Sequence, residues 1–403
     1  MVKPIKLHLE DMGPINEADI DISKITVIAG NNSTGKSTLS KFLYSFLRSN
    51  SFNRQEIAYE SIANIIQSES YYLSRRFNRK TPRFNRIDNY EDILNGYRDL
   101  KNMLFESDIS DKELEESNDK MNRIDNLIRV VNEDSHELYV SLMRRFLESE
   151  FSSTNFRGYI EINDFTIDFK NHDFSDDDAF REDSSFIIND AFYIDSLSVL
   201  DTFEKFDIKS TYHLEYLKRN LISKRRDVFD EKINSDIIEL ENEVSDIIKG
   251  KFVFERGEFK FISDTDIKSD MFNTSSGIKQ IGIIQLLLAN RSLKENSFLI
   301  IDEPEVNLHP EWQFRLAKIL VLISKRLNVH LYINTHSPLF VESVDAYSKY
   351  YDMADDTSYH MTQKSEKDGL FDIAQTDNLS EIYDNLGNPY FKMDMLRIEK
   401  ELE

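Results

Sequence analysis

The sequence predicts an α/β protein whose parallel strands carry functional side chains at one edge of a sheet. Three observations lead to this prediction. An apolar strand over residues 25–29 runs into a glycine-containing loop and then a helix, an apolar run over 297–301 ends in two acids, and a third run over 329–333 ends in a short polar segment. Carboxyl ends of parallel strands meet at one edge, where ligands bind in open α/β sheets.

The loop after the first strand has the composition of a phosphate-binding loop. It reads Gly30-Asn31-Asn32-Ser33-Thr34-Gly35-Lys36-Ser37-Thr38, and an apolar helix over 39–47 follows. Such a loop wraps backbone N–H groups around a polyanion, and the positive end of the next helix faces it. The two glycines permit a close backbone approach. We expect Lys36 to reach the β- and γ-phosphates, Ser37 to ligate Mg²⁺ and Thr38 to bind the α-phosphate.

The second strand supplies the acids that phosphate chemistry needs. After Ser297, residues 298–301 are continuously apolar, as in a strand buried on both faces, and Asp302 and Glu303 follow directly. We expect Asp302 to hold the Mg²⁺ shell and Glu303 to orient or deprotonate the attacking water. The third strand leads to Asn334-Thr335-His336-Ser337-Pro338. Because the three strand ends share one edge, we expect His336 to contact the γ-phosphate.

A further candidate anion site precedes the acidic strand. Residues 273–280 combine small hydroxyl side chains with Gly277, and an apolar helix over 281–288 follows. Taken alone, this segment indicates an ordinary capped helix start as well as an anion site, and the cap is the simpler interpretation. Its place in the order of motifs favours the anion site instead.

The order of phosphate loop, Ser-Ser-Gly helix start, Asp-Glu strand and Thr-His-Ser-Pro resembles an ABC-class ATPase head. More narrowly, the chain is similar to AAA-family ATPases of the overcoming-lysogenization-defect and Septu-type anti-phage defence group. The similar segments are Met-Gly-Pro-Ile at 12–15, Thr-Ser-Ser-Gly-Ile-Lys-Gln at 274–280, Asp-Glu-Pro-Glu-Val-Asn-Leu-His-Pro at 302–310 and Asn-Thr-His-Ser-Pro at 334–338. The resemblance covers residues 1–50 and 185–345.

The resemblance implies an α/β P-loop NTPase fold with an ABC-type head, which binds ATP and Mg²⁺ between two copies of the chain. In that arrangement Ser275, Ser276 and Gly277 of one copy cap the γ-phosphate that Lys36 of the other copy holds. Hydrolysis then requires dimerisation. The family's usual second signature glycine is replaced here by serine.

The resemblance also assigns roles around the acidic strand. Glu303 is the catalytic base, His336 the switch histidine, and residues 307–309 the segment that touches the partner head. A glutamine commonly completes the Mg²⁺ shell in the family. Gln280 and Gln285 are candidates by residue type alone, and we place neither in the site.

Length and composition suit this interpretation. A chain of 403 residues can bury a large core, and it contains no cysteine, which excludes disulfides and cysteine-based zinc sites. No segment has the length and apolarity of a membrane span, and the N-terminus lacks a secretory signal, so we expect a cytoplasmic protein with no membrane partner. The formal charge of −23 argues against nucleic-acid binding over the whole surface.

One segment is a local exception to the acidic charge. Residues 75–86 contain no acids and interleave aromatic side chains with Arg75, Arg76, Arg79, Lys80, Arg83 and Arg86. Such a segment can bind nucleic acid, because aromatic rings stack on bases and cations neutralise phosphates. The alternative is a solvated loop or a patch that docks on the acidic face of a partner subunit. We favour this alternative over nucleic-acid binding.

The motifs divide the chain into four parts. We expect an ATPase-head lobe over residues 1–50, a mostly helical insertion with a hairpin over 51–184, the rest of the head over 185–345, and a short acidic C-terminal tail over 346–403. The tail is too short for the nuclease domain that some relatives carry there.

Several functions remain open. The favoured one is an ATPase subunit that assembles around ATP and controls a separately encoded effector, expected to be a nuclease, in anti-phage defence. The alternative is a DNA-repair ATPase of the chromosome-maintenance type that clamps DNA, although long heptad arms and a cysteine zinc hook are missing. A transporter subunit and a built-in nuclease using Arg129 and His136 fit the sequence less well.

Overall fold

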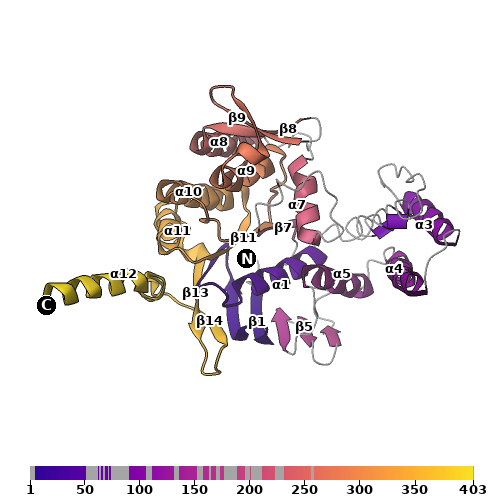
Figure 1. The fold of residues 1–403 in the computed structure, drawn as a ribbon, viewed down its shortest axis with the longest axis horizontal. Coiled ribbons are helices and arrows are strands. Elements are labelled where there is room, and N and C mark those ends of the chain that lie inside the picture. The colour runs from indigo at the N-terminus through magenta and orange to yellow at the C-terminus, as the bar shows by residue number, and fades with distance from the viewer. Residues whose placement is uncertain are drawn as a thin grey trace. The chain divides into compact units, whose positions relative to one another are not determined.

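The computed structural model describes most of the chain outside 51–89 and some short connections (Figure 1). The described ranges are 5–50, 90–105, 111–130, 136–151, 158–162, 165–168, 173–176, 188–195, 211–222, 231–255 and 258–402, with isolated positions between 62 and 73 and at 200. The chain forms two compact units. The first unit comprises Met1–Leu47 and Leu147–Glu403, and the second unit comprises Arg48–Phe146.

The first unit is built on a large mixed sheet. Within the described residues it has eleven strands in the order β6-β5-β4-β1-β2-β14-β13-β3-β12-β11-β7, beside a smaller sheet ordered β10-β9-β8. The strands are β1 (Ile5–Met12), β2 (Ile15–Ile22), β3 (Ile25–Ala29), β4 (Tyr159–Ile162), β5 (Phe165–Asp168), β6 (Asp173–Asp176), β7 (Asp190–Ile194), β8 (Gly250–Glu255), β9 (Glu258–Ser263), β10 (Lys268–Asp270), β11 (Ser297–Asp302), β12 (His330–Thr335), β13 (Thr357–Lys364) and β14 (Phe371–Gln375).

The helices of this unit begin and end at residues suited to those positions. They are α1 (Lys36–Ser49), α7 (Tyr212–Ile222), α8 (Glu231–Ile248), α9 (Ser276–Ala289), α10 (Pro310–Leu327), α11 (Pro338–Tyr350) and α12 (Leu379–Leu402). Proline occupies the first turn of α10 and α11, and Asn328 ends α10 in the left-handed conformation. Proline is preorganised for a first turn, and asparagine tolerates the left-handed region.

The centre of the large sheet is parallel and buried. β3 pairs with β12, and β12 pairs with β11, so that Ala29 lies beside Thr335 and Asp302 beside Asn334. All five residues of β3 are buried, as a sequence that is apolar except for Thr26 predicts. The three strands therefore end at one edge of the sheet. The predicted α/β class is confirmed.

The C-terminal part of the chain enters this sheet. β13 pairs in parallel with β3, so that Met361 lies beside Ala29, and β14 pairs antiparallel with β13 and parallel with β2. The hairpin expected within the insertion also joins the sheet, because β4 pairs with β1. The four predicted domain boundaries stay a prediction.

The second unit contains helices α3 (Tyr90–Phe105) and α4 (Asp111–Val130) and most of α5 (His136–Glu150). Leu100, Ile124 and Phe146 are fully buried within it. The hydroxyl of Tyr97 donates a hydrogen bond to the carbonyl of Met121 at 3.2 Å, which joins α3 to α4.

Several sequence predictions concern residues outside the described ranges. The basic segment 75–86 is among them. Of the residues that are described, none belongs to a helix with both the length and the apolarity needed to cross a membrane.

Candidate active site

The predicted phosphate loop connects β3 to α1, and two glycines are required by its packing. A Cβ atom on Gly30 would lie 1.9 Å from Oγ1 of Thr362 in β13. Gly35 has a φ of +97°, and a Cβ atom there would lie 2.4 Å from the side chain of Ile15. Glycine alone fits both positions without displacing neighbours. The structure thus places the loop between strand and helix, as the sequence predicts.

Lys36 lies inside its own loop. Its side chain is buried, and Nζ donates hydrogen bonds to the carbonyl oxygens of Gly30 at 2.8 Å and Asn31 at 2.6 Å. Burial lowers the pKa of Lys36, and the nearby charge of Glu303, Asp302 and Glu305 opposes that shift. The ammonium group is held where phosphate oxygens can replace the loop carbonyls as acceptors.

The other predicted loop residues line the outside of the turn. Asn31, Asn32, Ser33 and Ser37 are exposed, Thr38 is half-buried, and Thr34 is buried with its hydroxyl donating to the Asn31 carbonyl at 2.9 Å. The exposed hydroxyl of Ser37 faces solvent, where a ligand can reach it. The roles of these residues stay predictions.

Asp302 ends β11 and accepts hydrogen bonds from three side chains. Ser40 and Asn334 donate to Oδ1 at 2.9 and 2.6 Å, and the Tyr193 hydroxyl donates to Oδ2 at 2.8 Å. The hydroxyl of α1 that meets Asp302 is therefore that of Ser40, one turn beyond the predicted Ser37. A carboxylate offers about four acceptor positions, so one of them, on Oδ2, has no donor among the residues that the structure describes.

Glu303 has a strained backbone. Its φ of +50° lies in the left-handed region, which residues other than glycine rarely adopt, and its N–H donates to the Asn334 carbonyl at 2.8 Å. Oε1 of Glu303 lies 3.4 Å from Nδ1 of His336. The structure therefore brings the predicted base and the predicted switch histidine together, and strain of this kind is concentrated at functional sites.

Glu305 is a buried acid that the sequence analysis did not single out. Its Oε1 accepts hydrogen bonds from the Thr335 hydroxyl at 2.7 Å and the His336 N–H at 2.9 Å, and lies 3.3 Å from Nδ1 of His336. Burial raises the pKa of Glu305, and the hydrogen bonds from Thr335 and His336 oppose the shift. This carboxyl fixes the backbone that carries His336. Its position within Asp-Glu-Pro-Glu was the available signal.

The Ser-Ser-Gly segment begins α9, with Ser275 and Ser276 exposed and Gly277 buried. A Cβ atom on Gly277 would lie 2.7 Å from the carbonyl oxygen of Asn307, so the start of α9 packs directly on the segment after the acidic strand. Ser275 is the N-cap residue, yet its side chain makes no capping hydrogen bond. The exposed hydroxyls are thus not used by the helix itself.

The two candidate glutamines differ in their surroundings. Gln285 accepts a hydrogen bond from the Phe252 N–H at 2.8 Å and donates to the Gly250 carbonyl at 3.2 Å, which anchors β8 to α9. This structural role explains why glutamine stands there. Gln280 is buried near the start of the same helix.

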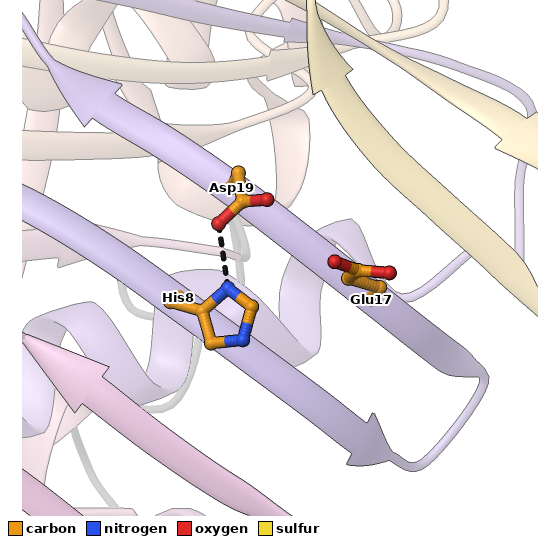
Figure 2. Close-up of side chains that lie close together, drawn as sticks. All are labelled: His8, Glu17 and Asp19. Carbon is orange, nitrogen blue, oxygen red and sulfur yellow. Dashed lines mark hydrogen bonds and ion pairs between the residues drawn. The ribbon is translucent and has the colours of Figure 1, made fainter.

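A second polar cluster lies away from these strand ends, on β1 and β2. Figure 2 shows His8, Glu17 and Asp19 with the His8 ring hydrogen-bonded to Asp19, and their ligand atoms all lie within 4.8 Å of one another. Burial lowers the pKa of His8, but Asp19 and Glu10 outweigh that effect and raise it. The ring is therefore satisfied as an ion-pair partner of Asp19.

The charges at the strand ends fit a phosphate ligand with Mg²⁺. The charges of Asp302, Glu303 and Glu305 act on the buried ammonium of Lys36, and within the described residues Asp302 keeps a carboxylate position without a hydrogen-bond donor. Mg²⁺ is bound in proteins through one or two carboxylates together with substrate phosphates. Asp302 and the Ser37 hydroxyl are the oxygen donors that we expect to hold it.

Comparison with solved structures finds similar chains at low identity. The SMC head domain from Thermotoga maritima is 12% identical, with 93% of this chain and 100% of that chain covered and a TM-score of 0.42. An Smc head domain with a coiled coil and joint from Pyrococcus yayanosii is 12% identical, covering 97% and 100%, with a TM-score of 0.40. An ATP-binding cassette of an ABC transporter in its ADP conformation is 11% identical, covering 96% of each chain, with a TM-score of 0.33.

Comparison with curated proteins finds no match. A protein family described as "AAA domain, putative AbiEii toxin, Type IV TA system" matches residues 25–342, a range that includes the phosphate loop, the start of α9, the acidic strand and His336. The matched range is most of the chain. The protein therefore belongs to this AAA-domain family.

Proposed function

We propose that the chain hydrolyses ATP at the carboxyl edge of β3, β12 and β11. The observation that carries this proposal is the convergence of Lys36, Asp302, Glu303 and His336, which come from segments up to 300 residues apart, at neighbouring ends of parallel strands. Such a group supplies a phosphate-binding cation, a metal-binding carboxylate and a base in one place.

In this mechanism Lys36 and the loop N–H groups bind the β- and γ-phosphates. Asp302 and Ser37 hold Mg²⁺, which neutralises charge on the phosphate oxygens when bound. Glu303 accepts a proton from the attacking water, and His336 contacts the γ-phosphate. Glu305 keeps the His336 backbone in place through its hydrogen bond to that N–H.

Substitution of the proposed base tests hydrolysis. Glu303→Gln removes the proton acceptor with little change in shape, so we expect ATP binding to persist while turnover falls by about 100-fold or more. Glu342→Gln, which makes the same change on an exposed face of α11, is the matched control. Phosphate release and binding of labelled ATP measure the two effects. Unchanged turnover in Glu303→Gln would exclude Glu303 as the base.

We further propose that hydrolysis requires two copies of the chain. Ser275 and Ser276 are exposed beside the segment that includes Asn307, and they make no hydrogen bond to the phosphate loop within the described residues. A second copy can present these hydroxyls and the α9 N-terminus to the γ-phosphate bound by the first. The ATP-bound state is then a dimer.

A charged substitution at the signature tests this arrangement. Ser276→Arg places a bulky cation where the second copy would contact the nucleotide, so we expect normal ATP binding, no ATP-dependent dimer and no hydrolysis. Ser380→Arg, at an exposed position early in α12, is the control. Sedimentation with and without ATP·Mg²⁺ measures the dimer. Full activity of Ser276→Arg would show that the nucleotide is not shared between copies.

The assembly is proposed to control a separately encoded effector, a nuclease, in anti-phage defence. Support comes from the motif resemblance to that defence group and from the AAA family that matches residues 25–342. Native mass analysis of the protein co-expressed with its gene neighbours, with and without ATP·Mg²⁺, tests this role. A stable mixed assembly supports it. A bare protein that dimerises with ATP and then retains DNA would favour the DNA-clamping alternative instead.

A further inference from the structure

Behind Asp302 lies a group of buried side chains to which the proposed mechanism assigns no role. Tyr193 in β7 is fully buried, and its hydroxyl donates to Oδ2 of Asp302 at 2.8 Å. Because Oδ1 already accepts from Ser40 and Asn334, the acceptor position that has no donor in the described part of the chain is on Oδ2. The Tyr193 hydroxyl therefore decides which way that free position points.

The ring of Tyr193 is held by His213. The two ring centroids lie 4.7 Å apart, and His213 is buried at the start of α7. Both ring nitrogens of His213 face acids. Nδ1 is hydrogen-bonded to Glu150, and Nε2 lies 3.1 Å from Oδ1 of Asp195. An imidazole held from both sides provides a rigid surface for the tyrosine.

Glu150 fastens this group to the end of α5. It is the last residue of that helix and is almost fully buried. One carboxylate oxygen accepts the backbone N–H of His213 at 3.1 Å, while the other pairs with its ring. The preceding residue, Ser149, accepts the N–H of Tyr212 at 2.7 Å. The first turn of α7 is thus capped by the end of α5.

We propose that Tyr193 is a positioning residue for Asp302, and that His213, held by Glu150 and Asp195, fixes Tyr193 in that role. This inference rests on the proposed function, because it assigns Asp302 to Mg²⁺. Hydrogen bonds of this kind orient metal ligands, and removing them typically weakens metal binding by 10- to 100-fold. The end of α5 is thereby joined to the nucleotide site through three side chains.

The test compares two tyrosines on neighbouring parts of the sheet. Tyr193→Phe removes the hydroxyl that meets Asp302. Tyr332→Phe is the matched control, because Tyr332 is equally buried in β12 and its hydroxyl makes no hydrogen bond within the described residues. Binding of a fluorescent, non-hydrolysable ATP analogue is titrated with Mg²⁺ and repeated in EDTA, so that the readout is metal-dependent binding and not turnover.

We expect Tyr193→Phe to raise the Mg²⁺ concentration for half-maximal binding by about 10-fold. The affinity of Tyr193→Phe for the nucleotide in EDTA should stay within about twofold of the wild type, and so should the Mg²⁺ requirement of Tyr332→Phe. Neither quantity depends on the hydrogen bond from the Tyr193 hydroxyl to Asp302. Equal Mg²⁺ requirements in Tyr193→Phe and the wild type would overturn the proposed role of Tyr193 and leave the proposed ATPase function untouched. A wild type without Mg²⁺-dependent nucleotide binding would overturn the proposed function as well.

The role of His213 is tested by a double-mutant cycle. His213→Gln should raise the Mg²⁺ requirement in the same direction, and adding it to Tyr193→Phe should cause no further increase. Effects that multiply would show that His213 does not act through Tyr193. If His213→Gln does not fold, Asp195→Asn takes its place, since the Asp195 side chain is a quarter exposed. Asp195→Asn is then combined with Tyr193→Phe, and the absence of a further increase in the Mg²⁺ requirement again supports a role through Tyr193.

Discussion

Substitution of Glu305 separates a structural role from a catalytic one. Glu305→Ala removes the acceptor of two buried donors, the Thr335 hydroxyl and the His336 N–H. Each donor left without a partner costs about 1–3 kcal/mol, so we expect the free energy of unfolding to fall by about 2–6 kcal/mol. The His336 backbone should also loosen, and turnover should fall with stability.

Glu305→Gln should behave differently. The amide oxygen can still accept from Thr335 and His336, while the new NH₂ group takes the place of Oε2, which has no hydrogen-bond partner within the described residues. Burial raises the pKa of Glu305, so its ionised form lowers stability at pH 7, and Gln removes that cost. We expect stability within about 1 kcal/mol of the wild type because this gain offsets the unpaired amide.

Urea unfolding measures both variants, with the fluorescence of the single tryptophan, Trp312, as the signal. Phosphate release measures turnover in the same preparations. Because the folded-state pKa of Glu305 is raised, wild-type stability should decline as pH rises from below its ordinary range towards neutrality, and Glu305→Gln should lack that decline. A Glu305→Ala variant as stable as Glu305→Gln would refute the assigned hydrogen-bonding role.

Three further predictions follow from packing and charge. Gly30→Ala should lower the free energy of unfolding by about 1–3 kcal/mol and weaken ATP binding, because its Cβ overlaps Thr362, and Thr362→Gly should restore part of the loss in the same urea and binding assays. Gly277→Ala should reduce ATP-dependent dimerisation in sedimentation, because its Cβ would press on the Asn307 carbonyl. Burial lowers the pKa of His213, but Asp195 and Glu150 outweigh it and raise the value to about 9. Protonated His213 should therefore add about 3 kcal/mol to the free energy of unfolding below pH 6.5, and this contribution should be lost as pH rises through 9. Unfolding measured at pH 6 and pH 9.5 should show this difference in the wild type and not in His213→Gln.

The central strands were predictable because most of their residues are apolar. β3 and β11 are buried on both faces, and their mostly apolar residues predict that burial. β13 was not predictable in the same way. Its residues Ser358, His360 and Thr362 are buried despite being polar, so its inward-facing positions carry no hydrophobic signal. Burial lowers the pKa of His360 to about 4, which keeps the ring neutral in the sheet.

The residues of the candidate site also differ in how far the sequence predicts them. Lys36, Asp302 and Glu303 belong to short motifs with fixed spacing, and sequence alone identifies them. Tyr193 and Asn334 reach Asp302 only because β7 and β12 flank β11 in the sheet. No local pattern predicts these two contacts with Asp302, because they depend on the order of the strands. Contacts of that kind follow from topology, which the sequence leaves open.

The place of β13 beside β3 has a consequence for synthesis of the protein. β3 gains its second neighbour only when residues 357–364 are available, more than 300 residues after the phosphate loop has been made. Thr362, which packs on Gly30, arrives with that same strand. During translation the nascent chain therefore has to keep the unpaired side of β3 from pairing wrongly until residues 357–364 have emerged from the ribosome. We expect chains released before residue 357 to need chaperones and to bind no ATP.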